Sequence, residues 1–352
     1  MDLQQGIAAV RPPCENSRAQ AAQRFSDIAM PLGSLGLLQD AVAQIAAIRR
    51  TPRPSIAKRA VVMFCADNGV VAQGVTQCGQ EVTATVTENM GRGQSAVCLM
   101  ARHIGMDSFP VDIGVARDVQ GERILHRKIR YGTADMTKEP AMTRAEAVRA
   151  VETGIELAQW CAAQGYDLLC GGEMGIGNTT TSAAVTAALT GADVQTVTGR
   201  GAGLSSEGLE RKVRAIQTAL ALHRPDPSDP LDVLHKVGGL DIAGLAGLYL
   251  GAAACGLPVV LDGVISCAAA LVAVRLCPEV RGYLLAGHRS EEPAGALLLR
   301  ELELRPFITA GMRLGEGTGA VAAVSLLDLV FAAYDGMPRF DEVGIEAYQP
   351  LA

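Results

Sequence analysis

A glycine-dense run between two apolar stretches constrains this chain more than any other feature: Gly171–Ser182, with the sequence GGEMGIGNTTTS. The run follows Tyr166–Cys170, a short apolar stretch typical of a buried strand, and precedes an alanine-rich stretch that predicts a helix to Leu189. A glycine-rich turn between a strand and a helix brings backbone N–H groups close to a phosphate, and the helix start adds a partial positive charge. With Asn178 or Thr179 as the N-cap, the stretch predicts an anion site where a strand ends.

The four glycines of this run predict a sharp turn, because glycine has no Cβ to obstruct the backbone. Two common nucleotide motifs do not fit it. The spacing from Gly172 to Gly177 is close to that of a triphosphate-binding loop, but Asn178 stands where that loop needs a lysine. The pair Gly175 and Gly177 lacks the third glycine of a dinucleotide fingerprint. We therefore predict a phosphate loop that carries its own carboxylate, Glu173, with an ordinary glycine-rich turn as the alternative.

Composition limits the classes of partner. The chain has 352 residues, enough for about two domains or one large domain with an appendage. Hydrophobic residues make up 49% of it and aromatics only 4%, with 39 glycines, which suits close helix–sheet packing and argues against a nucleic-acid surface built on aromatic stacking. The net charge of −6 gives no electrostatic reason to expect nucleic acid, so a phosphorylated ligand would need a local site.

The nine cysteines form no CxxC pair and are odd in number, which predicts reduced core cysteines in a cytoplasmic protein. The first residues lack the basic and apolar segments of a signal peptide. Ile242–Leu261 contains twenty residues without a charge, long enough to span a bilayer. Because Gly256–Pro258 interrupts it, we interpret this stretch as a buried helix followed by a buried strand, with a membrane span as the alternative.

Strand-like stretches alternate with helical patterns along the chain. The expected strands are Lys58–Cys65, Ser108–Ile113, Tyr166–Cys170, Pro258–Asp262 and Gly282–Ala286. This alternation predicts an α/β fold: a doubly wound, mostly parallel sheet with helices on both faces. In such sheets ligands bind off the carboxyl ends of the strands, where the glycine-rich turns are expected.

The ends of the chain are predicted to form a small helical lobe. Residues 1–55 have helical patterns and no strand, and form the N-terminal part of this lobe. Residues 56–335 form a Rossmann-like α/β core, from which C-terminal helices can join the lobe, and 336–352 form a tail. Within the core, Asp118–Thr137 is charged and irregular, which predicts a surface excursion.

The second informative run is Arg313–Gly319, RLGEGTG, just before a predicted helix. The guanidinium of Arg313 suits a phosphate or a carboxylate in bidentate geometry. Glu316, three residues further on, suits a general base if apolar neighbours such as Leu314 raise its pKa. The alternative is an exposed turn with a surface ion pair.

Three further side chains are candidates for ligand contacts. Ser290 could donate to a phosphate, while its neighbour His288 is equally well explained as a structural loop residue. Lys212 follows the glycine turn TGRGAG by about two helical turns and could reach back to an anion, with a solvated lysine as the alternative. Asp262 ends an apolar strand, where it could bind a ribose hydroxyl or cap the next helix. No His, Cys or Asp cluster has metal-ligand spacing, so we expect no metal.

Several motifs occur together and in order: GSLG, ADNGVVAQGVT, QEVTATVTENM, GGEMGIGNTTTSAA, TGRGAGLSSEGLERK, LDGVIS, GHRSEEPAG and RLGEGTGA. Over residues 30–335 the chain therefore resembles the nicotinate-nucleotide–dimethylbenzimidazole phosphoribosyltransferase family. The resemblance implies a homodimer without a cofactor that makes α-ribazole phosphate for the lower loop of cobamides. In the implied reaction a benzimidazole nitrogen attacks ribose C1′ of nicotinate mononucleotide, and nicotinate leaves with inversion from β to α.

The resemblance also implies roles for the candidates. Glu316 would take the proton of the attacking azole, with Glu173 as a second carboxylate in the same pocket. The residues implied to surround the phosphate are Gly175, Gly201, Lys212, Ser290 and Arg313, and those implied to lie near the ribose or the base are Gln80, Asp262 and Leu314. The implied partners are small-molecule substrates and a second copy of the chain, with neither nucleic acid nor membrane.

One stretch departs from the family pattern. Many members carry Tyr-Pro before QEVT, whereas this chain has Thr76–Gly79, TQCG, there. That part resembles the lining of the base pocket, so the acceptor stays open between dimethylbenzimidazole, another benzimidazole, a purine and a phenol. From other classes, the alternatives are a non-catalytic sensor of a phosphorylated cofactor and a different nucleotide-ribosyl enzyme such as a phosphorylase.

Overall fold

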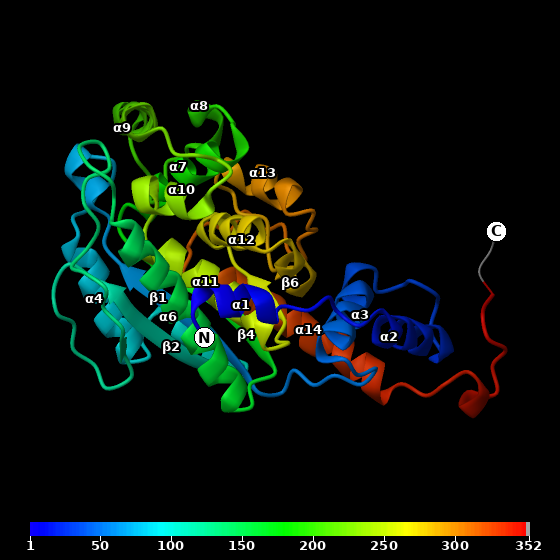
Figure 1. Ribbon diagram of the computed structural model, residues 1–352. Helices are drawn as coiled ribbons and strands as arrows, with labels where there is room; N and C mark the ends of the chain where they lie inside the picture. Colours follow the sequence, from blue (N-terminus) through cyan, green and yellow to red (C-terminus); the bar gives the residue numbers. More distant parts are fainter. Residues whose placement is uncertain (350–352) are drawn as a thin grey trace.

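The computed structural model describes residues 1–349 and is built around a six-stranded parallel sheet with the order β3-β2-β1-β4-β5-β6 (Figure 1). Its strands are β1 (Arg59–Ala66), β2 (Asp107–Gly114), β3 (Leu125–His126), β4 (Leu168–Met174), β5 (Val259–Leu261) and β6 (Leu284–Ala286). From the central pair β1 and β4 the chain winds outward in opposite directions. In open α/β sheets the ligand site lies at this switch point, off the carboxyl ends of the strands.

Helices cover both faces of the sheet, because successive side chains of a strand point to opposite faces. In β1, Val62 and Phe64 belong to one hydrophobic core, and Met63 and Cys65 belong to the other. The helices of the first core are α1 (Leu3–Ala9), α6 (Arg144–Ala163), α7 (Asn178–Thr190), α8 (Val194–Val197), α9 (Ser206–His223), α10 (Pro230–Val237), α11 (Leu240–Ala254), α12 (Val264–Leu276) and α13 (Ala294–Glu301). The helices of the second are α2 (Glu15–Asp27), α3 (Leu37–Arg49), α4 (Glu81–Gly91), α5 (Ala96–His103) and α14 (Thr318–Gly336).

The expected α/β architecture is confirmed, with two local corrections. The strand predicted for Tyr166–Cys170 begins later and ends later, since β4 runs from Leu168 through Met174. Gly171 and Gly172 are therefore strand residues, not turn residues. The irregular stretch predicted at Asp118–Thr137 contains β3, whose two residues pair with β2 and carry no alternating apolar pattern that sequence reasoning could use.

Gly171 and Gly172 lie in a strand because other parts of the chain approach them closely. A Cβ on Gly171 would lie 2.2 Å from the hydroxyl oxygen of Tyr249, on α11. A Cβ on Gly172 would lie 2.2 Å from the backbone carbonyl oxygen of Glu316. These glycines are thus needed for close approach rather than for turn geometry.

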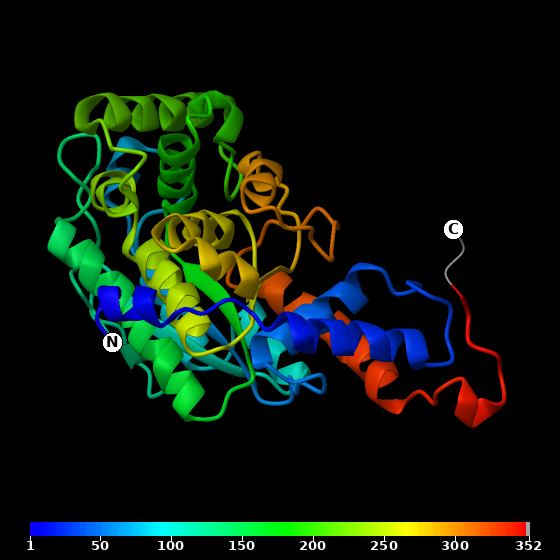
Figure 2. The same ribbon diagram turned by 45° about the vertical axis from the view of Figure 1, so that its right-hand side comes forward.

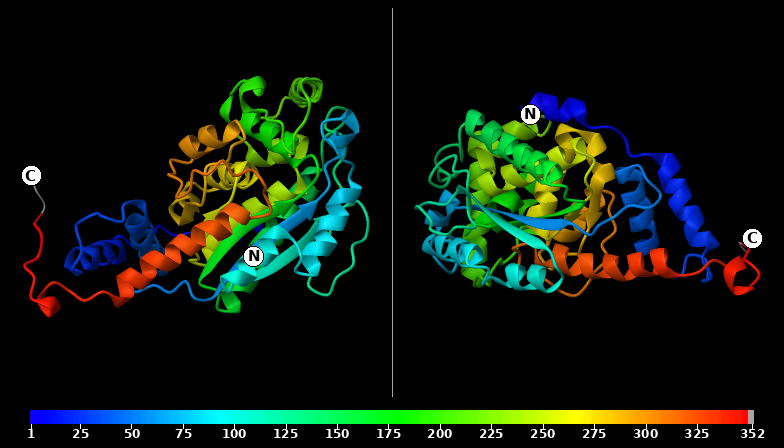
Figure 3. Two further views of the ribbon diagram at one scale, coloured as in Figure 1. Left: turned by 180° about the vertical axis from the view of Figure 1, so that it is seen from behind. Right: turned by 90° about the horizontal axis from the view of Figure 1, so that it is seen from below.

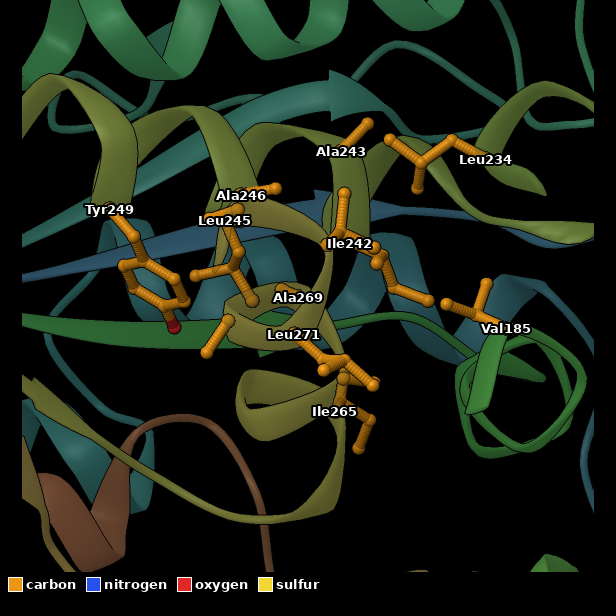
Figure 4. Close-up of a cluster of buried hydrophobic side chains, with 14 of the residues drawn as sticks. Val185, Leu234, Ile242, Ala243, Leu245, Ala246, Tyr249, Ile265, Ala269 and Leu271 are labelled. Carbon is orange, nitrogen blue, oxygen red and sulfur yellow. The ribbon is translucent and has the colours of Figure 1, made fainter. Parts of the chain in front are cut away.

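Glycines also allow α6 and α11 to cross in close contact. A Cβ on Gly247 would lie 1.9 Å from the carbonyl oxygen of Val151, and one on Gly154 would lie 2.1 Å from that of Gly244. The other side of α11 is packed with larger side chains such as Leu245 (Figure 4). All of α11 except its last residue is buried, so the apolar stretch that begins at Ile242 is a core helix followed by β5, as expected.

The N- and C-terminal segments form the expected small lobe, which projects from the sheet core (Figures 2 and 3). In it α2 and α3 pack against each other and against the far end of α14, where the rings of Phe25 and Tyr334 lie 4.7 Å apart. The guanidinium of Arg24 donates to the carbonyl of Tyr334. In contrast, α1 contacts α6 and α11 on the sheet core. The domain limits at residues 55 and 335 stay predictions.

Among residues 1–349, α14 is the only helix long and apolar enough to cross a membrane. Half of its apolar window is buried within the protein, where it packs against α3, α5, β4 and β5. This packing is that of a core helix. All nine cysteines are free, and six of them are buried: Cys65, Cys98, Cys161, Cys170, Cys267 and Cys277.

The α6–α11 crossing leads to a stability prediction. We expect Gly247→Ala to destabilise the fold by at least about 2 kcal/mol, because its methyl group would meet the backbone of Val151. Gly336→Ala, at a helical position with nothing within 4 Å of the added Cβ, is the matched control and is expected to change stability by less than about 0.5 kcal/mol. Urea denaturation measures both, and equal stabilities would contradict the close contact.

Candidate functional site

A cavity of about 220 Å³ lies at the carboxyl ends of β4, β5 and β6. Its walls come from the turns that follow these strands, from the start of α7 and from the loop before α14. It is therefore at the edge expected from the switch point. The residues predicted from sequence that line it are Glu173, Gly175, Gly201, Asp262, Ser290, Arg313, Leu314 and Glu316.

Glu173, near the end of β4, is a buried carboxylate with two hydrogen-bond donors. Its Oε2 accepts from the side-chain amide of Asn178, and its Oε1 accepts from the backbone N–H of Glu316 at 3.4 Å. Burial raises the pKa of Glu173 to about 8, with the negative charges of Asp241 and Asp262 adding to the effect. The carboxyl group therefore titrates close to neutral pH, as groups in proton-transfer sites often do.

Glu316 lies in a turn with a left-handed backbone. Its φ is +64°, and its neighbours Gly315 and Gly317 also have positive φ values, of 88° and 101°. A left-handed conformation is unfavourable for a residue with a side chain, so the surroundings must impose it. Sequence reasoning identified this glycine-flanked turn, but not the unusual conformation of the glutamate itself.

The carboxylate of Glu316 is directed to the start of α5. Its Oε2 accepts from the backbone N–H of Val97 at 3.3 Å. Burial raises the pKa of Glu316, while the hydrogen bonds from Val97 and from the hydroxyl of Ser95 oppose the rise. Leu314, the apolar neighbour expected to raise the pKa of Glu316, is 59% exposed, so the burial of Glu316 comes from α5 and the end of the sheet instead.

Asp262 follows β5 and is almost fully buried. It accepts backbone hydrogen bonds from the start of α14, not from the helix that comes next in sequence. The imidazole of His288, which follows β6, lies with its Nε2 3.5 Å from Oδ1 of Asp262. Of the two roles expected for Asp262, ribose contact and capping, the structure thus contains a capping interaction, on a different helix.

Glycine-rich and basic groups surround another part of the cavity, next to the start of α7. The ammonium group of Lys212 donates to the hydroxyl of Thr179 at 2.8 Å and to the carbonyl of Gly199 at 3.0 Å. Burial lowers the pKa of Lys212 to about 8, opposed by the charge of Glu292. The backbone N–H of Gly201 donates to Glu292 at 3.0 Å. Lys212 does not line the cavity itself but supports Thr179, which does.

The remaining residues predicted from the sequence do not all lie at the cavity. Gln80 does not line the cavity; its amide donates to the carbonyl of Asn68 at 3.3 Å. Arg313 lines the cavity but is exposed. Sequence reasoning missed Asn178 as the partner of Glu173, and it missed Glu292. No local sequence pattern indicates these contacts. Asn178 is expected from the sequence to be a helix N-cap, and Glu292 lies in a polar loop without a recognisable motif.

No cluster of three or more His, Cys, Asp or Glu side chains within residues 1–349 could hold a metal ion. The cavity has both apolar and polar walls, which include the buried carboxyl groups of Glu173 and Asp262 and the glycine-rich start of α7, with Lys212 buried behind Thr179. This arrangement suits an anionic ligand that reacts near a carboxylate.

Comparisons with known proteins agree with this arrangement. A family model described as phosphoribosyltransferase matches residues 10–345. Nicotinate-nucleotide–dimethylbenzimidazole phosphoribosyltransferase from Acetivibrio thermocellus is 46% identical over 328 residues, covering 93% of each chain. The protein of the same name from Chloroflexus aggregans is 48% identical over 335 residues, covering 95% of each chain. The crystal structure of CobT from Thermus thermophilus superimposes with a TM-score of 0.90 at 41% identity, covering 95% of this chain and 100% of that chain.

The fold and the cavity, together with the matching family model, define an α/β phosphoribosyltransferase. Sequence identity of this extent over nearly the whole chain identifies the family more narrowly than the fold and the cavity do. The chain belongs to the nicotinate-nucleotide–dimethylbenzimidazole phosphoribosyltransferase family.

The raised pKa of Glu173 leads to a pH prediction. In the folded chain this carboxyl keeps its proton to about pH 8, so its contribution to stability is present at low pH and is lost as pH rises from the ordinary value of 4.5. Glu173→Gln removes this titration. We expect its unfolding free energy, relative to wild type, to increase by roughly 2–4 kcal/mol between pH 5 and 9.

Urea denaturation across this pH range measures the difference. Glu210→Gln, on an exposed face of α9, is the matched control and should follow the wild-type pH dependence. A Glu173→Gln curve parallel to that of wild type would show that the carboxyl is ionised throughout.

Proposed function

We propose that this chain transfers the phosphoribosyl group of nicotinate mononucleotide to a benzimidazole-type base, giving α-ribazole 5′-phosphate and nicotinate. The observation that carries the proposal is the cavity at the switch point, which is lined by Glu173, by Glu316 and by the glycine-rich turn before α7. The names of relatives that align over nearly the whole chain support the same reaction.

The nucleotide phosphate is assigned to the glycine-rich side of the cavity. Gly175 and the start of α7 offer backbone N–H groups there, and Lys212 supplies a buried positive charge behind Thr179. Gly201, Ser290 and Arg313 also line the cavity and complete the proposed phosphate contacts. Gln80 and Asp262 are proposed to lie near the ribose or the base. The side chain of each already forms a hydrogen bond with a backbone group, which limits its direct contact with the substrate.

The reaction then needs a proton acceptor near the base. The azole nitrogen attacks C1′ from the face opposite nicotinate, the C1′–N bond to nicotinate breaks, and the configuration inverts. The second azole nitrogen loses its proton, which Glu316 takes as general base. Its raised pKa makes ionised Glu316 a better proton acceptor than an ordinary surface carboxylate. Glu173 holds the backbone of Glu316 and is a second carboxylate in the same pocket.

The acceptor base would lie against the wall formed by Thr76, Gln77 and Cys78, with Leu314 at the cavity rim. Incubation with nicotinate mononucleotide and a panel of benzimidazoles, adenine and phenols, followed by mass and anomeric analysis of the riboside, identifies the acceptor. An α-riboside of a benzimidazole is expected. A phenol riboside would favour the phenol-ribosylating alternative, and phosphate-dependent cleavage would favour a phosphorylase. Absence of nicotinate release with every acceptor would favour a non-catalytic sensor.

The role of Glu316 has its own test. We expect Glu316→Gln to lower kcat by about 10²–10⁴-fold with little change in nucleotide binding, because the amide cannot accept the azole proton. Glu291→Gln is the matched control, since this exposed glutamate lies near the same turn without lining the cavity. Steady-state kinetics measures both. A wild-type kcat in Glu316→Gln would remove this carboxylate from the mechanism.

We further propose that the protein acts as a cytoplasmic homodimer. Supporting a dimer, the packed helices α5 and α14 expose two large apolar side chains, Leu99 at 49% and Leu329 at 69%. A second copy of the chain would cover these side chains, since apolar patches on a protein surface mark association sites. The mass of the protein in sedimentation experiments decides between monomer and dimer.

A further inference from the structure

We propose that Asp262, supported by His288, is a positioning residue that holds Glu316 in its catalytic conformation by anchoring the start of α14. The inference rests on the proposed function, in which Glu316 is the general base. It concerns how that base is kept in place, which neither the family match nor the names of the relatives address.

The anchoring is a set of three backbone hydrogen bonds. Oδ2 of Asp262 accepts from the N–H of Gly317 at 3.1 Å, and Oδ1 accepts from Gly319 at 2.6 Å and from Ala320 at 3.2 Å. The first N–H groups of a helix have no partner within the helix, and a carboxylate there also interacts favourably with the helix dipole. Asp262 thus fixes the start of α14 to the end of β5.

Glu316 precedes the anchored residues directly, and its backbone is strained. With a φ of +64° it needs a surrounding structure that over-determines its conformation. On one side its own N–H is held by Glu173 at 3.4 Å, and on the other the next N–H, that of Gly317, is held by Asp262. The strained residue is therefore clamped between two carboxylates that come from the ends of β4 and β5.

His288 completes the anchor from the end of β6. Its ring is 3% exposed and packs against α14, where a Cβ on Gly319 would lie 1.9 Å from the imidazole. Its Nε2 faces Oδ1 of Asp262 at 3.5 Å, while its Nδ1 has no partner among the described residues. Burial alone would lower the pKa of His288, but the hydrogen bond and charge of Asp262 outweigh it and raise that pKa.

This arrangement leaves Asp262 little capacity for a substrate hydroxyl. Both of its carboxylate oxygens already accept backbone hydrogen bonds, and its own N–H donor is occupied by the hydroxyl of Ser266. Its charge nevertheless acts on the chemistry, because it raises the pKa values of both Glu316 and Glu173. The start of α14 packs on Asp262, and the titratable groups whose pKa values its charge raises are Glu173, Glu316, His288, Tyr249, Cys170 and Cys267.

A double-mutant cycle tests the inference. Asp262→Asn keeps the shape of the side chain but loses an acceptor and the charge. Alone, it is expected to lower kcat by about 10–100-fold, since small misplacements of a catalytic group have effects of this size. The KM for nicotinate mononucleotide should stay within about threefold. In a Glu316→Gln background the same substitution should lower kcat by less than about threefold, because both changes disable one unit.

The pH profile is the second measurement. In Asp262→Asn the acid limb of kcat, which reports ionisation of Glu316, should move to lower pH, because the charge that raises that pKa is gone. A purely structural loss would lower the whole profile without moving it. His288→Gln keeps the charge of Asp262, so it should lower kcat by a smaller factor without moving the acid limb to lower pH.

Controls separate the possible failures. Asp112→Asn removes another buried carboxylate that accepts a backbone N–H, from Val115, but lies outside the cavity, and it should leave kcat and the pH profile unchanged. Equal losses from Asp262→Asn in both backgrounds, or a loss confined to KM, would overturn the inference. Wild-type kcat in Glu316→Gln alone would also overturn the inference, because Glu316 would not be the base. Absence of nicotinate release by the wild-type chain with every acceptor would instead overturn the proposed function. If Asp262→Asn does not fold, His288→Gln takes its place in the cycle, with the same outcomes deciding.

Discussion

The contact between two backbones at Gly172 determines the geometry of the site. The turn that carries Glu316 lies directly on β4, where a Cβ on Gly172 would be 2.2 Å from the carbonyl of Glu316. Gly315 is in similarly close contact, since its Cβ would lie 2.6 Å from Oε1 of Glu173. Glu173 and Glu316, which are 143 residues apart in the chain, are therefore joined by a hydrogen bond from the backbone N–H of Glu316 to the carboxyl group of Glu173. Any side chain at these glycines would separate them.

Burying acids at the end of the sheet requires compensation, because an isolated carboxylate in a low-dielectric interior is strongly unfavourable. Asp262 is compensated by three backbone N–H groups and by His288. Glu173 and Asp241 have fewer donors, and burial raises their pKa values to about 8 and about 7. The same cluster thus contains one carboxyl group held by the start of α14 and two whose pKa values are raised by burial, so their surroundings differ within one small region.

The sequence allowed the α/β class, the positions of most strands and the two glycine-rich runs to be predicted, because these depend on local patterns. The helix from Thr143, with its Thr143–Glu146 capping box, is another local feature that the structure contains. The local reasoning failed where long-range contacts decide. Gly171 and Gly172 were predicted to be turn residues, but only the approach of Tyr249 and Glu316 explains them. The link from Asp262 to α14 spans 55 to 58 residues and has no local signal.

The proposed reaction also needs the substrate to bind in one orientation, and an uneven distribution of charge around the cavity supplies it. The buried ammonium group of Lys212 lies behind Thr179 at the start of α7 and attracts a nucleotide phosphate. The carboxyl group of Glu173 accepts a hydrogen bond from Asn178 at the same helix start, but with a pKa of about 8 it is mostly uncharged at neutral pH and repels the phosphate little. A chain with a net charge of −6 cannot steer an anion by its overall field, so this local positive charge has to provide both the binding and the orientation.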